Sequence, residues 1–151
     1  SAFLLNHENR VRHDSDFVFY NNPETMNGAV RHAGDNKTGD GAGDDEKIDI
    51  NLDEITFDIE KIAFSVTIHN ASERQQNFGL VKNAYIRICN QDAGDELVRF
   101  DLTVDAAENN GFVFGELFRE GSSWKFKALG TGVTGGLYQI ARGYNVNVAA
   151  P

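Results

Sequence analysis

The chain has 151 residues, enough for one domain with a sizeable core, and 40% of its residues are hydrophobic. Its formal net charge of −9 disfavours binding to nucleic acid or to an anionic membrane through general electrostatics. With Cys89 as its one cysteine, an intrachain disulfide and a cysteine zinc cluster are excluded. The sequence shows neither a signal-peptide pattern nor an apolar run of about 20 residues. We therefore expect a soluble cytoplasmic protein that is not inserted in a membrane.

Alternation of apolar and polar residues predicts short strands along most of the chain. The clearest is residues 61–69, KIAFSVTIH, in which Ile62, Phe64 and Val66 share one face. Further strands are expected at residues 2–5, 16–20, 29–33, 47–52, 83–89, 97–102, 112–119 and 124–129. The last two of these are expected to pair as a hairpin. In the strand at 112–119, simple alternation places Phe112, Phe114 and Glu116 on one face.

The segments between the strands carry turn residues and one helical pattern. Asn21, Asn22 and Pro23 predict a turn, residues 53–60 a connection, and the glycine-rich stretch 130–136 a loop. Residues 137–144 place Leu137, Ile140, Ala141 and Tyr144 at helical spacing. The pattern as a whole predicts an all-β protein, a two-sheet β-sandwich with a short C-terminal helix, as a single domain over residues 1–151.

Residues 34–46, GDNKTGDGAGDDE, are here called the acidic segment. It holds five carboxylates, those of Asp35, Asp40, Asp44, Asp45 and Glu46. Asn36 and Thr38 add two further side-chain oxygens. The segment also has four glycines, Gly34, Gly39, Gly41 and Gly43. The glycines allow sharp turns that aim backbone carbonyls inward. Ca²⁺ takes about six to eight oxygen ligands and would relieve the repulsion between the carboxylates. We therefore hypothesise a calcium site in this segment.

The acidic segment is not an EF-hand. Asp35 and Glu46 stand at the first and last positions of a 12-residue window, but Lys37 and Gly39 fall where ligands belong. Residues 47–52 alternate as a strand rather than continuing as a helix. The alternative interpretation is a solvated acidic loop.

Asn21 and Asn22 have two interpretations. They form a turn, or their amide oxygens also bind calcium, provided that residues 16–20 pair near residues 48–52 and bring them beside the acidic segment. Asp16 opens that strand, and its role stays open at this stage. The four histidines do not show metal-ligand spacing, and His69 is expected to be an ordinary hydrogen-bonded residue.

Six motifs occur together in a characteristic order: FVFYNN (17–22), the acidic segment, VTIH (66–69), FGELFRE (114–120), WKFKALGTG (124–132) and GGL (135–137). Together they resemble the TerD family of tellurium-resistance and stress-response proteins over nearly the whole chain. The resemblance implies a β-sandwich that binds calcium, with two ions in the family pattern, and no enzymatic activity. It also implies other tellurium-resistance cluster proteins as partners, some of them at the membrane.

Carried over onto matching positions, the resemblance assigns calcium ligands in the acidic segment. These are side chains of Asp35, Asn36, Thr38, Asp44, Asp45 and Glu46, and backbone carbonyls of Gly39 and Gly41, with Asn21 and Asn22 as further candidates. Family members carry an acidic D-x-D-L-D-A stretch just before S-A-F-L-L. This chain begins at Ser1, where that stretch would have finished. We therefore expect that the N-terminal segment of the family is missing here.

The expected function is a calcium-binding sensing or interaction module in tellurite resistance and stress response. Two alternatives stay open. A metal-dependent hydrolase would need a general base, for which His69 is the candidate. A lectin-like sandwich, whose calcium holds a sugar, would need exposed aromatic residues beside the acidic segment, whereas the aromatic residues here alternate as core. Direct binding of tellurium oxyanions is disfavoured by the net charge of −9.

Overall fold

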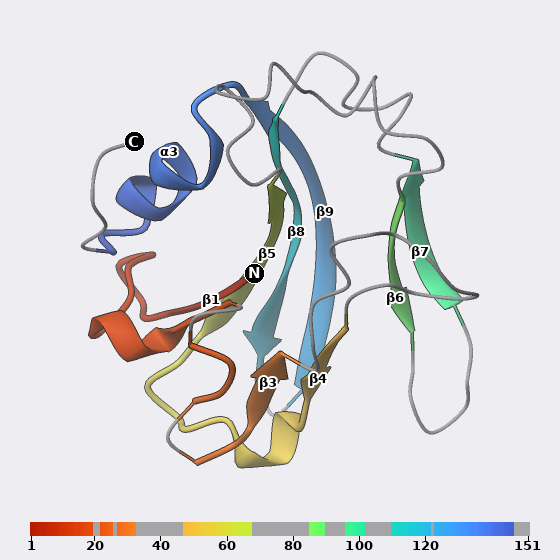
Figure 1. The fold of residues 1–151 in the computed structure, drawn as a ribbon. Helices are drawn as coiled ribbons and strands as arrows, with labels where there is room; N and C mark the ends of the chain where they lie inside the picture. Colours follow the sequence, from red (N-terminus) through yellow and green to blue (C-terminus); the bar gives the residue numbers. More distant parts are fainter. Residues whose placement is uncertain are drawn as a thin grey trace.

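The computed structural model describes residues 1–19, 22–25, 27–32, 47–67, 85–89, 96–101, 110–121 and 123–146. Within these ranges the chain is all-β with one short α-helix, as predicted (Figure 1). The strands are β1 (Ala2–Leu5), β2 (Phe17–Val18), β3 (Val30–His32), β4 (Ile48–Ile50), β5 (Lys61–Thr67), β6 (Tyr85–Cys89), β7 (Glu96–Asp101), β8 (Gly111–Glu120) and β9 (Ser123–Val133). Two 3-10 turns, η1 (Asp14–Asp16) and η2 (Leu52–Glu54), and helix α3 (Gly136–Gly143) complete the list. No helix in the described ranges is long and apolar enough to cross a membrane.

The strands form one large sheet and two small ones. The large sheet has the order β2-β1-β5-β8-β9, with every pair of neighbours antiparallel. β3 pairs with β4, and β6 pairs with β7, also antiparallel. Figure 1 shows α3 on one side of the long strands β8 and β9, and the β6–β7 pair on the other. The second layer of the sandwich is thus made of two strand pairs.

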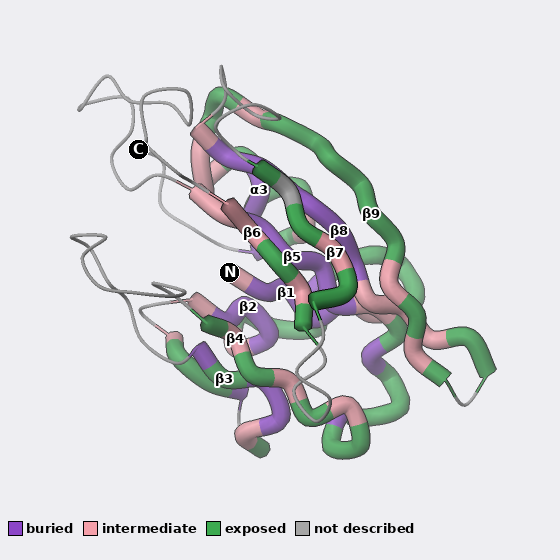
Figure 2. The backbone as a smooth tube through the Cα atoms, turned by 90° about the vertical axis from the view of Figure 1, so that its right-hand side faces the viewer, coloured by how far each residue is buried: buried purple, intermediate pink, exposed green. Residues whose placement is uncertain are grey.

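Two apolar clusters cover the two faces of the large sheet. The first cluster combines Leu4, Ile62 and Phe64 of the large sheet with Val30 of β3, and Ile48, Ile50, Ile86 and Ile88 of the small sheets pack against it. The second cluster combines Phe3, Leu5 and Phe17 with Ile140 and Ala141 of α3. Because both faces of β1 are covered, all four of its residues are apolar and buried. Figure 2 shows β1, β5 and β8 buried at the centre and the edge strand β9 largely exposed.

An irregularity in β8 changes the faces predicted by simple alternation. Phe64 of β5 pairs with Gly115 and Ser65 with Val113, so Phe114 is an extra residue in β8. Beyond this bulge, Leu117 rather than Glu116 packs on the cluster that holds Phe112 and Phe114. The prediction that Glu116 shares their face is therefore wrong, because one inserted residue reverses the alternation.

Strand β9 is longer than its sequence indicates. The stretch 130–136 was predicted as a loop, but β9 continues to Val133, and Phe112 pairs with Gly132. Between Val113 and Gly115 the register with β9 also shifts, and Gly130 takes a positive φ of 69° there. Glycine accepts this conformation without a steric cost. The long partner strand β8 thus keeps a glycine-rich segment in the sheet.

Helix α3 confirms the predicted terminal helix and its inward face. Ile140 and Ala141 are buried, and Leu137 and Tyr144 pack against the same cluster. Asn110, just before β8, fixes the start of the helix, since its Oδ1 accepts from the Gly136 N–H at 3.0 Å. The helix therefore covers one face of the large sheet, opposite the β3–β4 and β6–β7 strand pairs.

Candidate metal centre

Most of the predicted calcium ligands lie outside the described residues. This holds for Asn21, Asp35, Asn36, Thr38, Gly39, Gly41, Asp44, Asp45 and Glu46, as it does for Asp40 and His69. Asn22 is described, as are the two strands that flank the acidic segment. Over the described ranges, no group of three or more His, Cys, Asp or Glu side chains is arranged to hold a metal ion.

The acidic segment connects two strands that pair directly with each other. His32 at the end of β3 lies opposite Ile48 at the start of β4, and Val30 lies opposite Ile50. The Asn51 N–H donates to the Ala29 carbonyl at 2.8 Å, which extends the pairing beyond β4. Val30 is fully buried, and His32 is 9% exposed. The strands on either side of the segment are therefore paired in a ladder that is anchored in the core.

Asn22 lies beside this hairpin. Glu24 bridges to Arg31, and the Pro23 carbonyl accepts from the His32 N–H, so residues 22–24 run antiparallel along β3. In this direction Asn22 lies next to the end of β3, where the chain leads into the acidic segment. The structure thus places Asn22 at the base of the hairpin, as the calcium hypothesis requires.

The route that brings Asn22 there differs from the predicted one. Phe17 and Val18 pair with β1 rather than with residues 48–52, so the pairing that was given as the condition for a metal role of Asn21 and Asn22 is not the one that forms. β1 is the more apolar neighbour and buries both residues. A tight turn from Phe19 to Asn22, closed by two backbone hydrogen bonds of 3.1 Å, then redirects the chain. The turn predicted at Asn21–Pro23 is therefore found slightly earlier in the chain, closed between Phe19 and Asn22.

Two hydrogen bonds from its amide nitrogen fix the orientation of the Asn22 side chain. Nδ2 donates to the Phe17 carbonyl at 2.8 Å and to the Ser15 carbonyl at 3.3 Å. The other amide atom, Oδ1, is the type of oxygen that binds Ca²⁺. Asn22 therefore has a structural role in the turn and carries the acceptor that the metal hypothesis needs.

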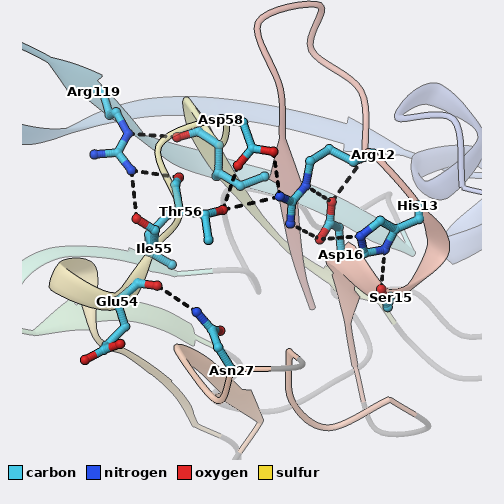
Figure 3. A network of polar contacts seen from close by, with 11 residues as sticks. Arg12, His13, Ser15, Asp16, Asn27, Glu54, Ile55, Thr56, Asp58 and Arg119 are labelled. Atoms are coloured by element: carbon cyan, nitrogen blue, oxygen red, sulfur yellow. Dashed lines mark hydrogen bonds and ion pairs between the residues drawn. The ribbon is translucent and has the colours of Figure 1, made fainter.

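A buried ion pair that sequence reasoning missed, between Arg12 and Asp16, lies in the part of the chain just before β2 (Figure 3). Asp16 is 2% exposed, and both of its oxygens accept from the Arg12 guanidinium, Oδ2 from Nε and Oδ1 from Nη2, each at 2.8 Å. Arg12 Nη1 donates to Asp58 Oδ2 at 2.7 Å. Arg12 and Asp16 are four residues apart, and this short spacing can be read from the sequence. No sequence pattern links Asp58 to them, because it lies 46 positions from Arg12. The role of Asp16 is thus to fix the turn at residues 12–16 against the 53–60 connection.

These contacts shift two pKa values. The hydrogen bond to Asp16, followed by that to Asp58, raises the pKa of Arg12 above its ordinary value despite partial burial. The hydrogen bond from Arg12, followed by that from Thr56, lowers the pKa of Asp58. Both shifts favour the charged forms of Arg12 and Asp58.

Arg119, in the FGELFRE motif, binds the same connection from β8. It donates to the carbonyls of Ile59 at 2.8 Å, Ile55 at 3.0 Å and Thr56 at 2.9 Å. Its guanidinium lies 4.4 Å from the centre of the Trp124 ring. The motif therefore serves to hold residues 55–59, and Arg12 and Arg119 approach that connection from two sides (Figure 3).

An open cavity of about 250 Å³ lies beside this network, and its lining includes Arg12, His13, Ser15, Asp16 and Ile55. Ser15 Oγ contacts His13 Nδ1, and His13 Nε2 lies 4.0 Å from Asp16 Oδ1. This spacing differs from that of a nucleophile activated through a histidine, because Asp16 is committed to Arg12 on both oxygens. The geometry favours a structural role for these polar groups.

Comparisons with a family model and with known proteins point to the same family. A family model described as the TerD domain matches residues 1–144. The chain is 48% identical over 149 residues to the tellurium resistance protein TerD of Alcaligenes sp, covering 99% of this chain and 78% of that protein. It is 46% identical over 148 residues to general stress protein 16U of Bacillus subtilis (strain 168), covering 98% and 77%.

A solved structure supports the architecture. The crystal structure of a homologue of telluride resistance protein (TerD) from Streptomyces coelicolor A3(2) matches with a TM-score of 0.78 and 20% identity, covering 99% of this chain and 85% of that one. At this identity the likeness shows the fold alone.

Proposed function

Because the chain belongs to the TerD family, whose relatives carry the names of tellurium resistance and general stress proteins, we propose that it is a calcium-binding, non-enzymatic sensing or interaction module. In this proposal the acidic segment binds Ca²⁺ in the cytoplasm under tellurite or other stress. The ordered segment then presents a surface to other proteins of the resistance cluster.

The observation that carries the proposal is the β3–β4 ladder at the base of the acidic segment. The pairing of His32 with Ile48 brings together the strands on either side of the segment, and the bridge from Glu24 to Arg31 adds Asn22 to that base. Crowding of carboxylates on a closed hairpin raises their mutual repulsion, and a divalent cation offsets it. The hairpin thus supplies the fixed frame that a calcium loop requires.

The donor set fits Ca²⁺ rather than a softer metal. Carboxylates of Asp35, Asp44, Asp45 and Glu46, the Asn36 and Asn22 amides, the Thr38 hydroxyl and the carbonyls of Gly39 and Gly41 are all hard oxygen donors. Zinc and copper sites are built from imidazole and thiolate, and the acidic segment contains neither histidine nor cysteine. When bound, calcium would supply charge neutralisation and cross-linking of the segment.

The stabilisation expected from bound calcium is large enough for calcium to switch the state of the domain. A ligand present at about 100 times its Kd, and bound only by the folded state, stabilises that state by roughly 2.7 kcal/mol. The net charge of −9 adds to the effect, since each bound ion removes part of the self-repulsion of the fold. Calcium would therefore raise both the stability of the domain and the order of the segment.

Calorimetric titration with calcium tests the proposal. We expect the wild-type chain to bind Ca²⁺ and the Asp45→Ala variant to bind it at least tenfold more weakly. The matched control is Asp53→Ala, which removes an exposed acid from η2 outside the segment and should leave the affinity unchanged. Equal affinities for wild type and Asp45→Ala would contradict the assignment of the site.

A further inference from the structure

The turn at residues 55–59 presents an exposed aromatic side chain between two buried anchors. Ile55 and Ile59 are 7% and 0% exposed and fix the backbone against the core. Phe57, midway between them, is 90% exposed. Since its ring contributes so little buried surface, the fold does not require phenylalanine at this position. The turn lies in the connection between η2 and β5, at the bottom of Figure 1.

Arg12 and Arg119 hold the turn in place through hydrogen bonds. Arg119 binds the carbonyls of Ile55, Thr56 and Ile59, and the Ile59 N–H donates to the Thr56 carbonyl at 3.1 Å. Thr56 Oγ1 donates to Asp58 Oδ1 at 2.7 Å, and Arg12 binds the other oxygen of Asp58. The backbone on both sides of Phe57 is therefore already ordered. A preorganised anchor reduces the entropy lost when a partner binds.

The chain segment that carries Phe57 is acidic, and two arginines from other parts of the chain, Arg12 and Arg119, bind to it. Residues 53–60, DEITFDIE, hold four acids and no basic residue. Asp58 is engaged by Arg12, whereas Asp53, Glu54 and Glu60 are exposed around the turn. The Glu54 carbonyl accepts from Asn27 Nδ2 at 2.8 Å, which fixes the backbone there too (Figure 3). A partner that covers Phe57 therefore meets a segment whose own residues carry only negative charges.

We infer that Phe57 is the apolar anchor of a docking surface for a segment of another protein that is rich in arginine and lysine. An exposed aromatic ring in a segment with four acids and no basic residue suits such a partner, because a guanidinium can stack on the ring while it pairs with an acid. Docking of a second copy of this chain is disfavoured by its net charge of −9. This inference rests on the proposed interaction role and names the surface and the chemistry of the partner.

The probe is a phage library of random 12-residue peptides, panned against the calcium-loaded wild-type chain. We expect the enriched peptides to carry net positive charge and a large apolar residue. As synthetic peptides measured by fluorescence anisotropy, they should bind Phe57→Ser at least tenfold more weakly and lose affinity as salt rises. The matched control is Leu97→Ser on β7, where Leu97 is 62% exposed, and it should bind as the wild type does.

Three results of the peptide experiment would overturn the inference. These are failure to enrich any peptide, enrichment of neutral or acidic peptides, and equal affinity for wild type and Phe57→Ser. Sedimentation of the wild type as a dimer that Phe57→Ser dissociates would overturn it as well, since the occupant would then be a second copy. The Phe57→Ser variant should unfold within roughly 2 °C of the wild type and bind calcium normally. A normal calcium titration combined with lost peptide binding separates this surface from the proposed metal site.

Discussion

Replacing Arg12 by methionine tests the assignment of Asp16 as a buried structural carboxylate. Asp16 accepts three hydrogen bonds, of which two come from the Arg12 guanidinium at 2.8 Å and one from the Arg12 backbone N–H at 3.1 Å. Methionine removes the two charge-assisted bonds and keeps most of the apolar stem. The carboxylate then stays buried with only the backbone donor of the three.

The expected loss of stability follows from this burial. Removing one partner of a buried ion pair costs about 3–5 kcal/mol. The Arg12 side chain is 28% exposed, so water can reach the vacated side of Asp16 and hold the cost near the lower end, at about 3 kcal/mol. For a domain of this size, a loss of about 3 kcal/mol lowers the Tm by roughly 6–12 °C.

Urea and thermal unfolding of four proteins would measure this effect. They are the wild type, Arg12→Met, Asp16→Asn and the double variant. A fifth protein, Arg10→Met, is the control for loss of an exposed arginine two residues earlier in the chain. In the Asp16→Asn background, Arg12→Met should cost much less, because no buried charge remains to be orphaned. A loss below about 1 kcal/mol, or an equal loss in both backgrounds, would refute a buried pair.

Three further predictions concern the sheet, the ion pair and the turn. Gly115→Ala should destabilise by about 1–3 kcal/mol in urea unfolding, since its Cβ would meet the Phe126 ring and lie 2.7 Å from the Lys127 carbonyl oxygen; an unchanged midpoint would contradict the close approach. Asp58→Asn should cost at most about 1 kcal/mol at pH 7. That difference should vanish as pH falls below the ordinary value of 3.8, because Arg12 lowers the pKa of Asp58; a pH-independent difference would exclude the pair. Asn22→Ala should lower both the stability, by about 1 kcal/mol, and the calcium affinity in calorimetry, whereas a loss of stability alone would leave Asn22 a turn residue.

The parts of the fold that the sequence predicted are those with local signals. Alternation identified β5, and helical spacing identified α3 together with its inward residues Ile140 and Ala141. The apolar run AFLL identified β1. In each case the pattern records which faces are buried, and burial decides the structure.

The features that were missed depend on contacts between distant residues. The bulge at Phe114 and the extension of β9 to Val133 are set by the register of neighbouring strands, which single-strand periodicity does not encode. The network of Arg12 with Asp58 joins residues 46 positions apart. At the candidate site, composition indicated the acidic segment, whereas the antiparallel frame around it emerged only from the pairing of β3 with β4.

Amide hydrogen exchange at the base of the hairpin tests the central claim most directly, because the acidic segment is proposed to bind calcium within the β3–β4 frame. The His32 and Asn51 amides, bonded to the Pro23 and Ala29 carbonyls, report its opening. If opening releases the ion, calcium at 100 times its Kd should slow their exchange by up to about a hundredfold, and a chelator should reverse this. The Asn9 amide, in the separate Asn6–Asn9 turn, is the internal control and should not respond. Equal exchange of His32 and Asn51 with calcium and with chelator would contradict the account.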